Sequence, residues 1–190
     1  VLRDYQQNAL AAAIKWMKKN SEPALLELAT GAGKSLICAD IARIMRELSG
    51  KKVLCLCPSS ELVQQNHEKY LLTGNEASIY SASIGKSLRH DVVFATEGTF
   101  KKIAKEVGDQ YSTIILDEAH RITPTIKKII REMREGNPLL RVVGMTATPY
   151  RMLDGYIYEV DEHGAIVEET NKPYFKKLLY RVGGDYLVNR

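Results

Sequence analysis

The run Ala29–Ser35, which reads ATGAGKS, has the residue types of a loop that binds a chain of phosphates. Gly31 and Gly33 allow left-handed backbone angles and a close approach that a Cβ atom would prevent. A glycine-rich turn that opens a helix presents backbone N–H groups and the positive end of the helix dipole to an anion. Lys34 can then reach the terminal phosphates, and the Ser35 hydroxyl can bind Mg2+. The predicted nucleotide-binding residues of this loop are Thr30, Gly31, Ala32, Gly33, Lys34 and Ser35.

The sequence around this loop has the context that such a site requires. An apolar run, Ala24–Leu28, precedes the loop as a buried strand would, and apolar residues follow it at helical spacing. The usual pattern has a glycine five residues before Gly33, where this chain has Leu28. For the loop taken alone, a glycine-rich turn that binds nothing stays open as the alternative.

A second chemically capable group is the tetrad Asp117–His120, which reads DEAH and follows the apolar run Ser112–Leu116. A buried parallel strand delivers its last residues to the carboxyl edge of the sheet, where open α/β folds bind ligands. Two adjacent carboxylates there repel each other and lose solvation unless a cation is nearby. Asp117 is therefore expected to hold Mg2+ through water, and Glu118 to polarise an attacking water. The alternative is a pair of solvated loop acids.

In their order and spacing, the loop, the tetrad and the later run Gly144–Pro149 resemble helicase superfamily two, specifically the first RecA-like domain of its DEAH-type members. The resemblance covers nearly the whole chain. It implies that ATP and Mg2+ are the cofactors and that Ser35 and Asp117 hold the metal. Near the amino end, it implies that Gln6 contacts the adenine and that Arg3 lies beside it. The implied catalytic residues are Lys34, Asp117, Glu118 and His120.

Two further runs, Cys57–Val63 and Ala95–Phe100, resemble the motifs with which this superfamily touches the nucleic-acid backbone. The contact residues that they imply are Pro58, Ser59, Ser60, Thr96, Gly98 and Thr99. The run Gly144–Pro149 resembles the motif that links ATP chemistry to domain movement, with Thr146 and Thr148 as its coupling residues near His120. Contacts to phosphates and sugars carry no base information, so these motifs do not choose between DNA and RNA.

A finer resemblance lies in Asn66–Tyr70, Thr148–Arg151 and Gly155–Tyr158, which are similar to the RadD group of bacterial DNA-repair helicases. That group is related to the motor subunits of type I and type III restriction enzymes, and some of its members have a cysteine at the third position of the tetrad. The resemblance favours DNA over RNA as the partner and DNA repair as the setting. Three functions stay open: half of an ATP-dependent helicase or translocase, the motor of a restriction enzyme with an attached nuclease, and a nucleotide-gated nucleic-acid sensor that does not unwind.

The resemblance also implies a missing partner for the ATP site. Superfamily-two motors bind ATP between two RecA-like domains, and the second domain supplies an arginine finger worth roughly 10³–10⁵ in rate. The 190 residues have room for one such domain. We therefore expect a second RecA-like domain of the same protein as a partner, and weak ATP binding with slow or no hydrolysis by this chain alone.

Strand-like and helical patterns alternate along the chain, which indicates βαβ units and a parallel sheet. The predicted fold class is α/β: a three-layer RecA-like (P-loop NTPase) domain over residues 1–150, with a mostly parallel central sheet flanked by helices. Residues 151–190 are expected to form a small C-terminal extension. In it, residues 156–168 have the pattern of a hairpin, and residues 171–189 have the pattern of a helix.

Local signals mark one helix and one strand especially well. Thr123 is a good N-cap and Pro124 suits the first helical position. An apolar stripe follows, and Gly136 is expected to end the helix. The basic residues of this helix, Arg134 among them, are expected to be solvated. Cys55 and a second cysteine two residues later alternate within a strand-like run, which favours a buried strand face over a metal pair.

The composition fits a single domain with a core of its own. The chain is 45% hydrophobic, and its net charge of +4 with a pI near 8.9 suits a polyanionic partner without requiring one. No apolar run approaches the length of a membrane span, and the start lacks a signal-peptide pattern, so a membrane is not an expected partner. Three cysteines, an odd number, indicate reduced thiols and a cytoplasmic location.

Overall fold

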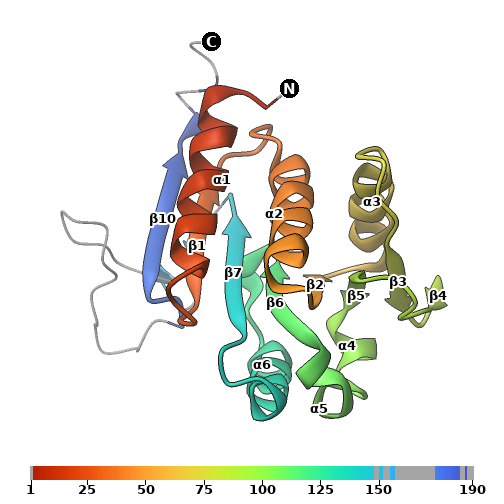
Figure 1. The fold of residues 1–190 in the computed structure, drawn as a ribbon. Coiled ribbons are helices and arrows are strands. Elements are labelled where there is room, and N and C mark those ends of the chain that lie inside the picture. The colour runs from red at the N-terminus through yellow and green to blue at the C-terminus, as the bar shows by residue number, and fades with distance from the viewer. Residues whose placement is uncertain (1, 148–149, 152–154, 157–173, 185–186, 188–190) are drawn as a thin grey trace.

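The computed structural model describes residues 2–147, 150–151, 155–156, 174–184 and 187. Its centre is an eight-stranded sheet with the strand order β10-β1-β7-β6-β2-β5-β3-β4 (Figure 1). Neighbouring strands pair in parallel except β3 and β4, which confirms the predicted sheet. The strands are β1 (Ala24–Leu28), β2 (Lys52–Cys57), β3 (Ser78–Ser81), β4 (Gly85–Lys86), β5 (Val92–Thr96), β6 (Tyr111–Leu116), β7 (Arg141–Thr146) and β10 (Lys177–Val182).

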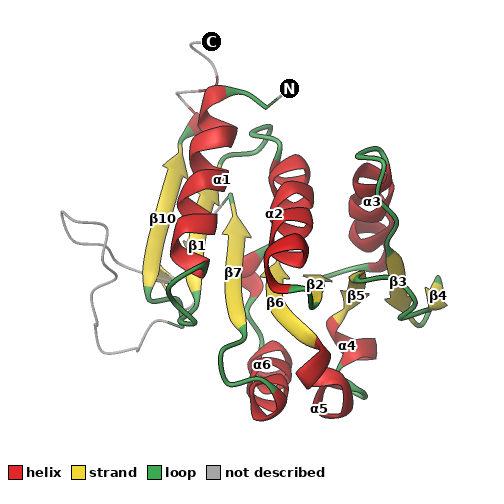
Figure 2. Ribbon diagram, in the orientation of Figure 1, coloured by secondary structure: helices red, strands yellow, loops and turns green. Residues whose placement is uncertain are grey.

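Helices cover both faces of the sheet, so the domain has the three layers that the sequence predicts (Figure 2). One apolar cluster lies under α1, α2 and α3, and a second lies under α4, α5 and α6. Among the described helices, none is both long enough and apolar enough to cross a bilayer. The helices are α1 (Asp4–Met17), α2 (Lys34–Ser49), α3 (Ser60–Leu71), α4 (Glu97–Phe100), α5 (Ala104–Val107) and α6 (Pro124–Gly136), with the 3-10 turns η1 (Gly108–Gln110) and η2 (Ala119–Arg121).

The central strand β2 is buried on both of its faces. Successive side chains of a strand point to opposite sides, so Val53, Cys55 and Cys57 join the cluster under α1–α3, and Leu54 and Leu56 join the other. Strands covered on both sides read as continuous apolar runs, as β2 and β6 do. The cysteines are buried free thiols, which confirms the predicted strand face.

The helix α6 begins and ends as its sequence predicts. The Thr123 hydroxyl accepts a hydrogen bond from the Ile126 N–H at 3.1 Å, and the helix ends at Gly136. The expected solvation of Arg134 is wrong, because its guanidinium donates to the backbone carbonyls of Ser21 and Leu140. Backbone carbonyls from two loops, one before β1 and one before β7, thus replace water as the partners of this cation.

The helix expected over residues 171–189 is wrong over residues 177–182, whereas the described residues 184 and 187 are helical. Residues Lys177–Val182 form β10, which pairs in parallel with β1. Without β10, β1 would be an edge strand with a row of unpaired N–H and C=O groups, so tertiary pairing overrides the local helical pattern. Of the hairpin expected over residues 156–168, only Tyr156 lies within the described residues. It belongs to β9 (Gly155–Tyr156), which forms a short antiparallel pair with β8 (Tyr150–Arg151).

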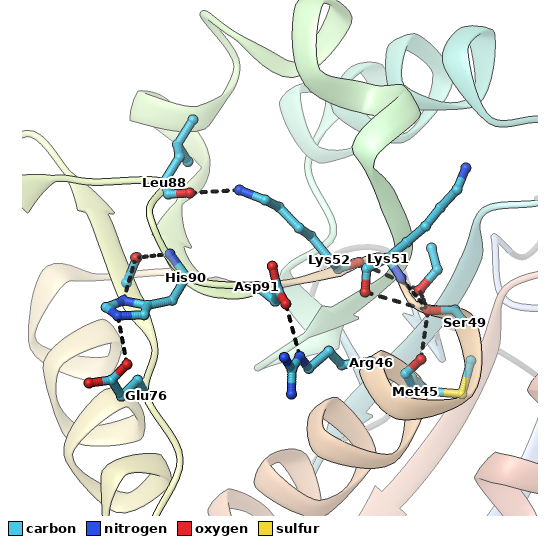
Figure 3. A network of polar contacts seen from close by, with 11 residues as sticks. Met45, Arg46, Ser49, Lys51, Lys52, Glu76, Leu88, His90 and Asp91 are labelled. Atoms are coloured by element: carbon cyan, nitrogen blue, oxygen red, sulfur yellow. Dashed lines mark hydrogen bonds and ion pairs between the residues drawn. The ribbon is translucent and has the colours of Figure 1, made fainter.

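A network of polar contacts ties the loops together at the amino edge of the sheet, away from the carboxyl strand ends (Figure 3). Arg46 near the end of α2 pairs with Asp91 at 3.0 Å, and His90 lies 3.2 Å from Glu76. The Lys52 ammonium donates to the carbonyl of Leu88 at 2.6 Å. Such exposed pairs contribute roughly 0–1 kcal/mol each. Their role here is to fix the loops that lead into β2 and β5.

Candidate functional site

The glycine-rich loop after β1 has the backbone that its sequence predicts. Gly31 has a φ of +86° and Gly33 a φ of +78°, both in the left-handed region that favours glycine. Gly33 is the N-cap of α2, so Lys34 and Ser35 occupy the first positions of that helix. Free N–H groups and the positive end of the α2 dipole therefore face the space at the carboxyl edge of the sheet.

Lys34 faces a carboxylate instead of open solvent. Its ammonium lies 2.9 Å from Oε1 of Glu118, and the side chains of Lys34 and Glu118 are 19% and 27% exposed. Lys34 is therefore partly enclosed, because the acidic end of β6 lies directly across from it. The contact brings the phosphate loop and the DEAH tetrad into one site.

Ser35 and Asp117, the two predicted metal ligands, share a partner that the sequence did not reveal. The Ser35 hydroxyl donates to Oδ1 of Asn66 at 2.9 Å, and Nδ2 of Asn66 donates to Oδ2 of Asp117 at 3.0 Å. Asn66 lies on α3 and is only 7% exposed. The available signal was a polar residue at a buried position of an amphipathic helix, between Val63 and Tyr70.

The backbone of the acidic tetrad is strained at Glu118. Glu118 has a φ of +52° and is the only described residue other than glycine with a positive φ. The conformation is held from both sides: the N–H of Asp117 donates to the Leu56 carbonyl of β2, and the N–H of Glu118 donates to Oδ1 of Asp117, both at 2.9 Å. Strain of this kind persists where the surroundings over-determine it, and it clusters at functional sites.

His120 connects the tetrad to the neighbouring strand. Its Nδ1 lies 3.0 Å from the Thr146 hydroxyl and 3.4 Å from Oε2 of Glu118. Thr146, at the end of β7, is fully buried. The predicted proximity of Thr146 and His120 is therefore confirmed, whereas Thr148 lies outside the described residues.

Gln6 lies against the phosphate loop. Its Nε2 donates to the Ala32 carbonyl at 2.9 Å, and its Oε1 accepts from the Arg3 N–H at 2.8 Å. A Cβ atom at position 33 would come within 2.3 Å of Gln6 Nε2, so a side chain there would displace the Gln6 amide from the loop. The site therefore includes Gln6, while the contacts of Gln6 and Arg3 with adenine stay a prediction.

The donor set fits Mg2+ held together with a nucleotide. Mg2+ prefers oxygen ligands and is usually bound by one or two carboxylates plus substrate phosphates and water. Ser35 and Asp117 offer such oxygens and are joined through a single amide. Within the described residues, no cluster of three or more His, Cys, Asp or Glu side chains could hold a metal by itself. A site of this kind would be completed by phosphate oxygens.

The two predicted nucleic-acid segments meet through a third segment. Ser60 at the start of α3 contacts the hydroxyls of Ser81 and Ser83 at 2.9 and 2.6 Å, and the Ala82 N–H donates to the Thr99 hydroxyl at 3.1 Å. The loop after β3 thus joins the ends of β2 and β5, although no motif in this loop predicted that role. Thr99 is buried and also accepts from Thr96, so its hydroxyl serves the loop. Pro58 and Gly98 are exposed, and Ser59 caps α3 through the Leu62 N–H.

A hollow of about 210 Å³ lies between these segments and the tetrad. Pro58 and Glu97 line one side, and Asp117 and Glu118 line the other. The Thr123 hydroxyl donates to Oε2 of Glu97 at 2.6 Å, which ties the start of α4 to the start of α6. The predicted nucleic-acid segments and the acidic site therefore share one edge of the sheet.

Known proteins are similar to this chain in sequence. The chain is 31% identical over 134 residues to the genome polyprotein of classical swine fever virus, covering 65% of this chain and 3% of the polyprotein. It is 28% identical over 156 residues to the ATP-dependent DNA helicase mph1 of Neurospora crassa, covering 74% of this chain and 13% of mph1. In both cases the chain spans a small part of its relative.

Solved protein structures share the fold of this chain. The UvsW helicase from bacteriophage T4 superposes with a TM-score of 0.64 at 27% sequence identity, over 78% of this chain and 53% of the UvsW chain. The fold is therefore the first RecA-like domain of a superfamily-two helicase. The model of the family described as the type III restriction enzyme res subunit matches residues 1–151. This chain belongs to that family.

Proposed function

We propose that this chain is the ATP-binding half of an ATP-dependent helicase or translocase acting on DNA, completed by a second RecA-like domain of the same protein. The observation that carries the proposal is the closure of the phosphate loop onto the acidic strand end. Lys34 lies 2.9 Å from Glu118, and Asn66 joins Ser35 to Asp117. The residue types that bind phosphate, metal and water thus form one site.

The residues of this site would work by positioning and charge, because phosphoryl transfer needs little covalent help from the protein. Lys34 would exchange Glu118 for the terminal phosphates of a bound nucleotide, which frees the Glu118 carboxylate to orient a water. Mg2+, held by Ser35 and Asp117, would supply charge neutralisation at the phosphates. His120, between Glu118 and Thr146, is placed to pass this change to β7.

DNA is the proposed nucleic-acid partner. The name of mph1 supports this choice, because that relative is an ATP-dependent DNA helicase. The segments proposed to contact the DNA backbone are Pro58–Ser60 and 96–99, with the loop after β3 between them. Because Thr99 is buried, we assign it to holding this loop and leave the outward contacts to Pro58, Gly98 and Ser60.

The second RecA-like domain is proposed to close over the exposed side of the same site. Lys34 and Glu118 keep 19% and 27% of their side-chain surface open, which leaves access for a group that acts across the cleft. An arginine finger in that position is worth roughly 10³–10⁵ in rate. This chain by itself should therefore bind ATP weakly and hydrolyse it slowly or not at all.

The proposed setting is DNA repair in the cytoplasm. The runs that resemble the RadD group support repair, and the tetrad makes the chain a DEAH-box protein with Mg2+ as its metal. The free thiols of Cys38, Cys55 and Cys57 support a reducing compartment.

The motor of a restriction enzyme is the second candidate function. The family description, which names the res subunit of type III restriction enzymes, favours it. Such a motor would need an attached nuclease, so cleavage of duplex DNA that depends on ATP would distinguish it from a repair helicase. A nucleotide-gated sensor would instead show nucleic-acid-stimulated hydrolysis without strand separation.

ATP hydrolysis by the full-length protein tests the proposal. It should be measured without nucleic acid and then with single-stranded DNA, forked duplex DNA and single-stranded RNA, with Glu118→Gln as the inactive control. Strong stimulation by DNA, absent in the variant, is the expected result. If the protein bound ATP but its hydrolysis rate were the same under all four conditions, a nucleic-acid motor would be contradicted. Stimulation of hydrolysis by RNA alone would contradict the choice of DNA.

A further inference from the structure

The helix α3 contributes two polar side chains, Asn66 and Lys69, to the nucleotide site, and neither has yet been given a role in binding ATP or Mg2+. Asn66 and Lys69 are one turn apart, so they share a face of the helix. Asn66 contacts both Ser35 and Asp117, and the ammonium of Lys69 lies 3.3 Å from the Ser35 hydroxyl. The start of the same helix carries the proposed DNA contact at Ser60. One rigid helix therefore reaches both sites.

The hydrogen-bond partners of Asn66 determine how its amide is oriented. An ionised carboxylate only accepts, so the atom facing Asp117 must be the NH2 group, and the oxygen must face the Ser35 hydroxyl. The same NH2 group lies 3.4 Å from the Cys57 sulfur. With 7% of its surface exposed, Asn66 has both ends of its amide satisfied inside the protein.

This arrangement leaves metal-binding lone pairs free. The Ser35 hydroxyl donates its proton to Asn66 and accepts from the Lys69 ammonium, so one lone pair of its oxygen stays available to a cation. Asp117 receives the Glu118 N–H at Oδ1 and the Asn66 amide at Oδ2, which fixes the plane of the carboxylate. Partners that orient metal ligands in this way typically change metal affinity by roughly 10–100-fold when they are removed.

Lys69 adds a second positive charge at the mouth of the site. The Lys34 ammonium is paired with Glu118, whereas the Lys69 ammonium contacts the neutral hydroxyl of Ser35. Lys69 is exposed, so its side chain can swing to an anion at modest cost. Its distance from Ser35 places it where phosphate oxygens around a Ser35-bound metal would lie.

We propose that α3 completes the ATP·Mg2+ site, with Asn66 as the positioning residue for the metal ligands Ser35 and Asp117 and with Lys69 as an additional phosphate-binding residue. The inference rests on the proposed nucleotide site. It assigns a role to part of the run Asn66–Tyr70, which the proposed DNA contacts leave without one. It also means that a shift of α3 on DNA binding changes the metal ligands directly.

Nucleotide binding measured against Mg2+ concentration tests this inference. A fluorescent ATP analogue would be titrated into the full-length protein at fixed Mg2+ levels and in EDTA, for wild type, Asn66→Ala and Asn66→Asp. We expect the Mg2+ concentration for half-maximal binding to rise about tenfold in Asn66→Ala, with affinity in EDTA within about twofold of wild type. Asn66→Asp loses the hydrogen-bond donor to Asp117 and should require at least as much Mg2+ as Asn66→Ala does.

Lys69→Met should weaken binding about threefold both with and without Mg2+, and the loss should shrink as salt is added. Gln65→Ala, an exposed amide on the same helix, and Lys19→Met, an exposed lysine elsewhere, are the matched controls and should bind as wild type does. Thermal melting of every variant identifies a general loss of folding.

The outcomes separate the two proposals. Wild type that binds no nucleotide at any Mg2+ level would overturn the proposed function itself. Wild type that binds, with Asn66→Ala showing the same Mg2+ dependence or an equal loss in EDTA, would overturn the role of Asn66 alone. Unchanged binding by Lys69→Met at low salt would overturn the role of Lys69.

Discussion

Glu118 combines three features in one residue: a positive φ of +52°, an ion pair with Lys34, and a place next to Asp117, the proposed metal ligand. Left-handed backbone costs residues other than glycine roughly 1–2 kcal/mol. The protein accepts that cost because the turn aims the Glu118 carboxylate at the phosphate loop instead of along the strand. Stability and function therefore oppose each other at this position.

Two substitutions at position 118 separate backbone strain from chemistry. Glu118→Gly and Glu118→Ala both remove the carboxylate, so both should abolish ATP hydrolysis. Only glycine relieves the strain, so Glu118→Gly should be more stable than Glu118→Ala by about 1 kcal/mol in chemical denaturation. Equal stability of the two variants would show that this turn is not strained.

Lys34→Ala tests the phosphate loop. The variant loses the ammonium that the proposal assigns to the terminal phosphates, so its affinity for ATP should fall at least about 100-fold, as expected for the loss of a charge-assisted contact at a partly buried site. The substitution removes one partly exposed ion pair with Glu118, so the melting temperature of the variant should stay close to that of wild type. A folded Lys34→Ala variant that bound ATP normally would refute the phosphate-loop assignment.

At the scale of elements, the strands hold the tetrad through close packing. Gly144 in β7 faces Ala119 of the tetrad and Phe175 in the segment that leads into β10. A Cβ atom at Gly144 would lie 2.7 Å from the Ala119 Cβ and 2.7 Å from the Phe175 ring. The absence of a side chain at this position thus allows three segments to meet beneath the site.

Gly144→Ala should therefore destabilise the fold by about 1–3 kcal/mol, the usual effect of overpacking a dense core. Gly85→Ala is the control, because no atom lies within 4 Å of a Cβ at that position, and its stability should match wild type. Denaturant midpoints of both variants give the comparison. A Gly144→Ala midpoint equal to that of the control would mean that this packing is looser than the contacts indicate.

The cysteines of β2 give a prediction about reactivity. A hydrogen bond with Cys38 and burial raise the pKa of the Cys55 thiol, and burial together with the nearby Asp117 charge raises the pKa of the Cys57 thiol. Thiolate is the reactive form, so a raised pKa lowers the reactive fraction at every pH below it. Iodoacetamide at pH 8 should label the native thiols at least about 100-fold more slowly than the thiols in urea. Rapid native labelling, read by mass spectrometry, would show that β2 opens readily.

At the scale of the whole molecule, a strand from late in the sequence, β10, forms one edge of the sheet. β10 covers the open side of β1, and Arg181 pairs with Glu27 at 2.7 Å across that junction. Phe175, just before β10, is fully buried in the cluster under α4–α6. The strand β1, which leads into the phosphate loop, thus becomes an interior strand, as β7 and β6 already are.

Phe175→Ala should cost about 3–5 kcal/mol of stability, as for other fully buried phenylalanines. Its neighbour Lys176 is exposed, so Lys176→Ala should change the free energy of unfolding by less than about 0.5 kcal/mol. Equilibrium denaturation of both variants tests whether the segment beyond residue 173 is part of the core. Equal stabilities would place it outside the cooperative unit.

The sequence by itself determined the α/β class, the phosphate loop, the acidic strand end and the cap of α6, because each depends on local periodicity or on residue types a few positions apart. Only the tertiary structure decided which distant groups meet. It paired Lys34 with Glu118, placed Asn66 between Ser35 and Asp117, buried Thr99, and made residues 177–182 a strand instead of a helix. These outcomes depend on sheet order and on pairing between segments far apart in the chain, where burial and unpaired backbone groups outweigh local preference.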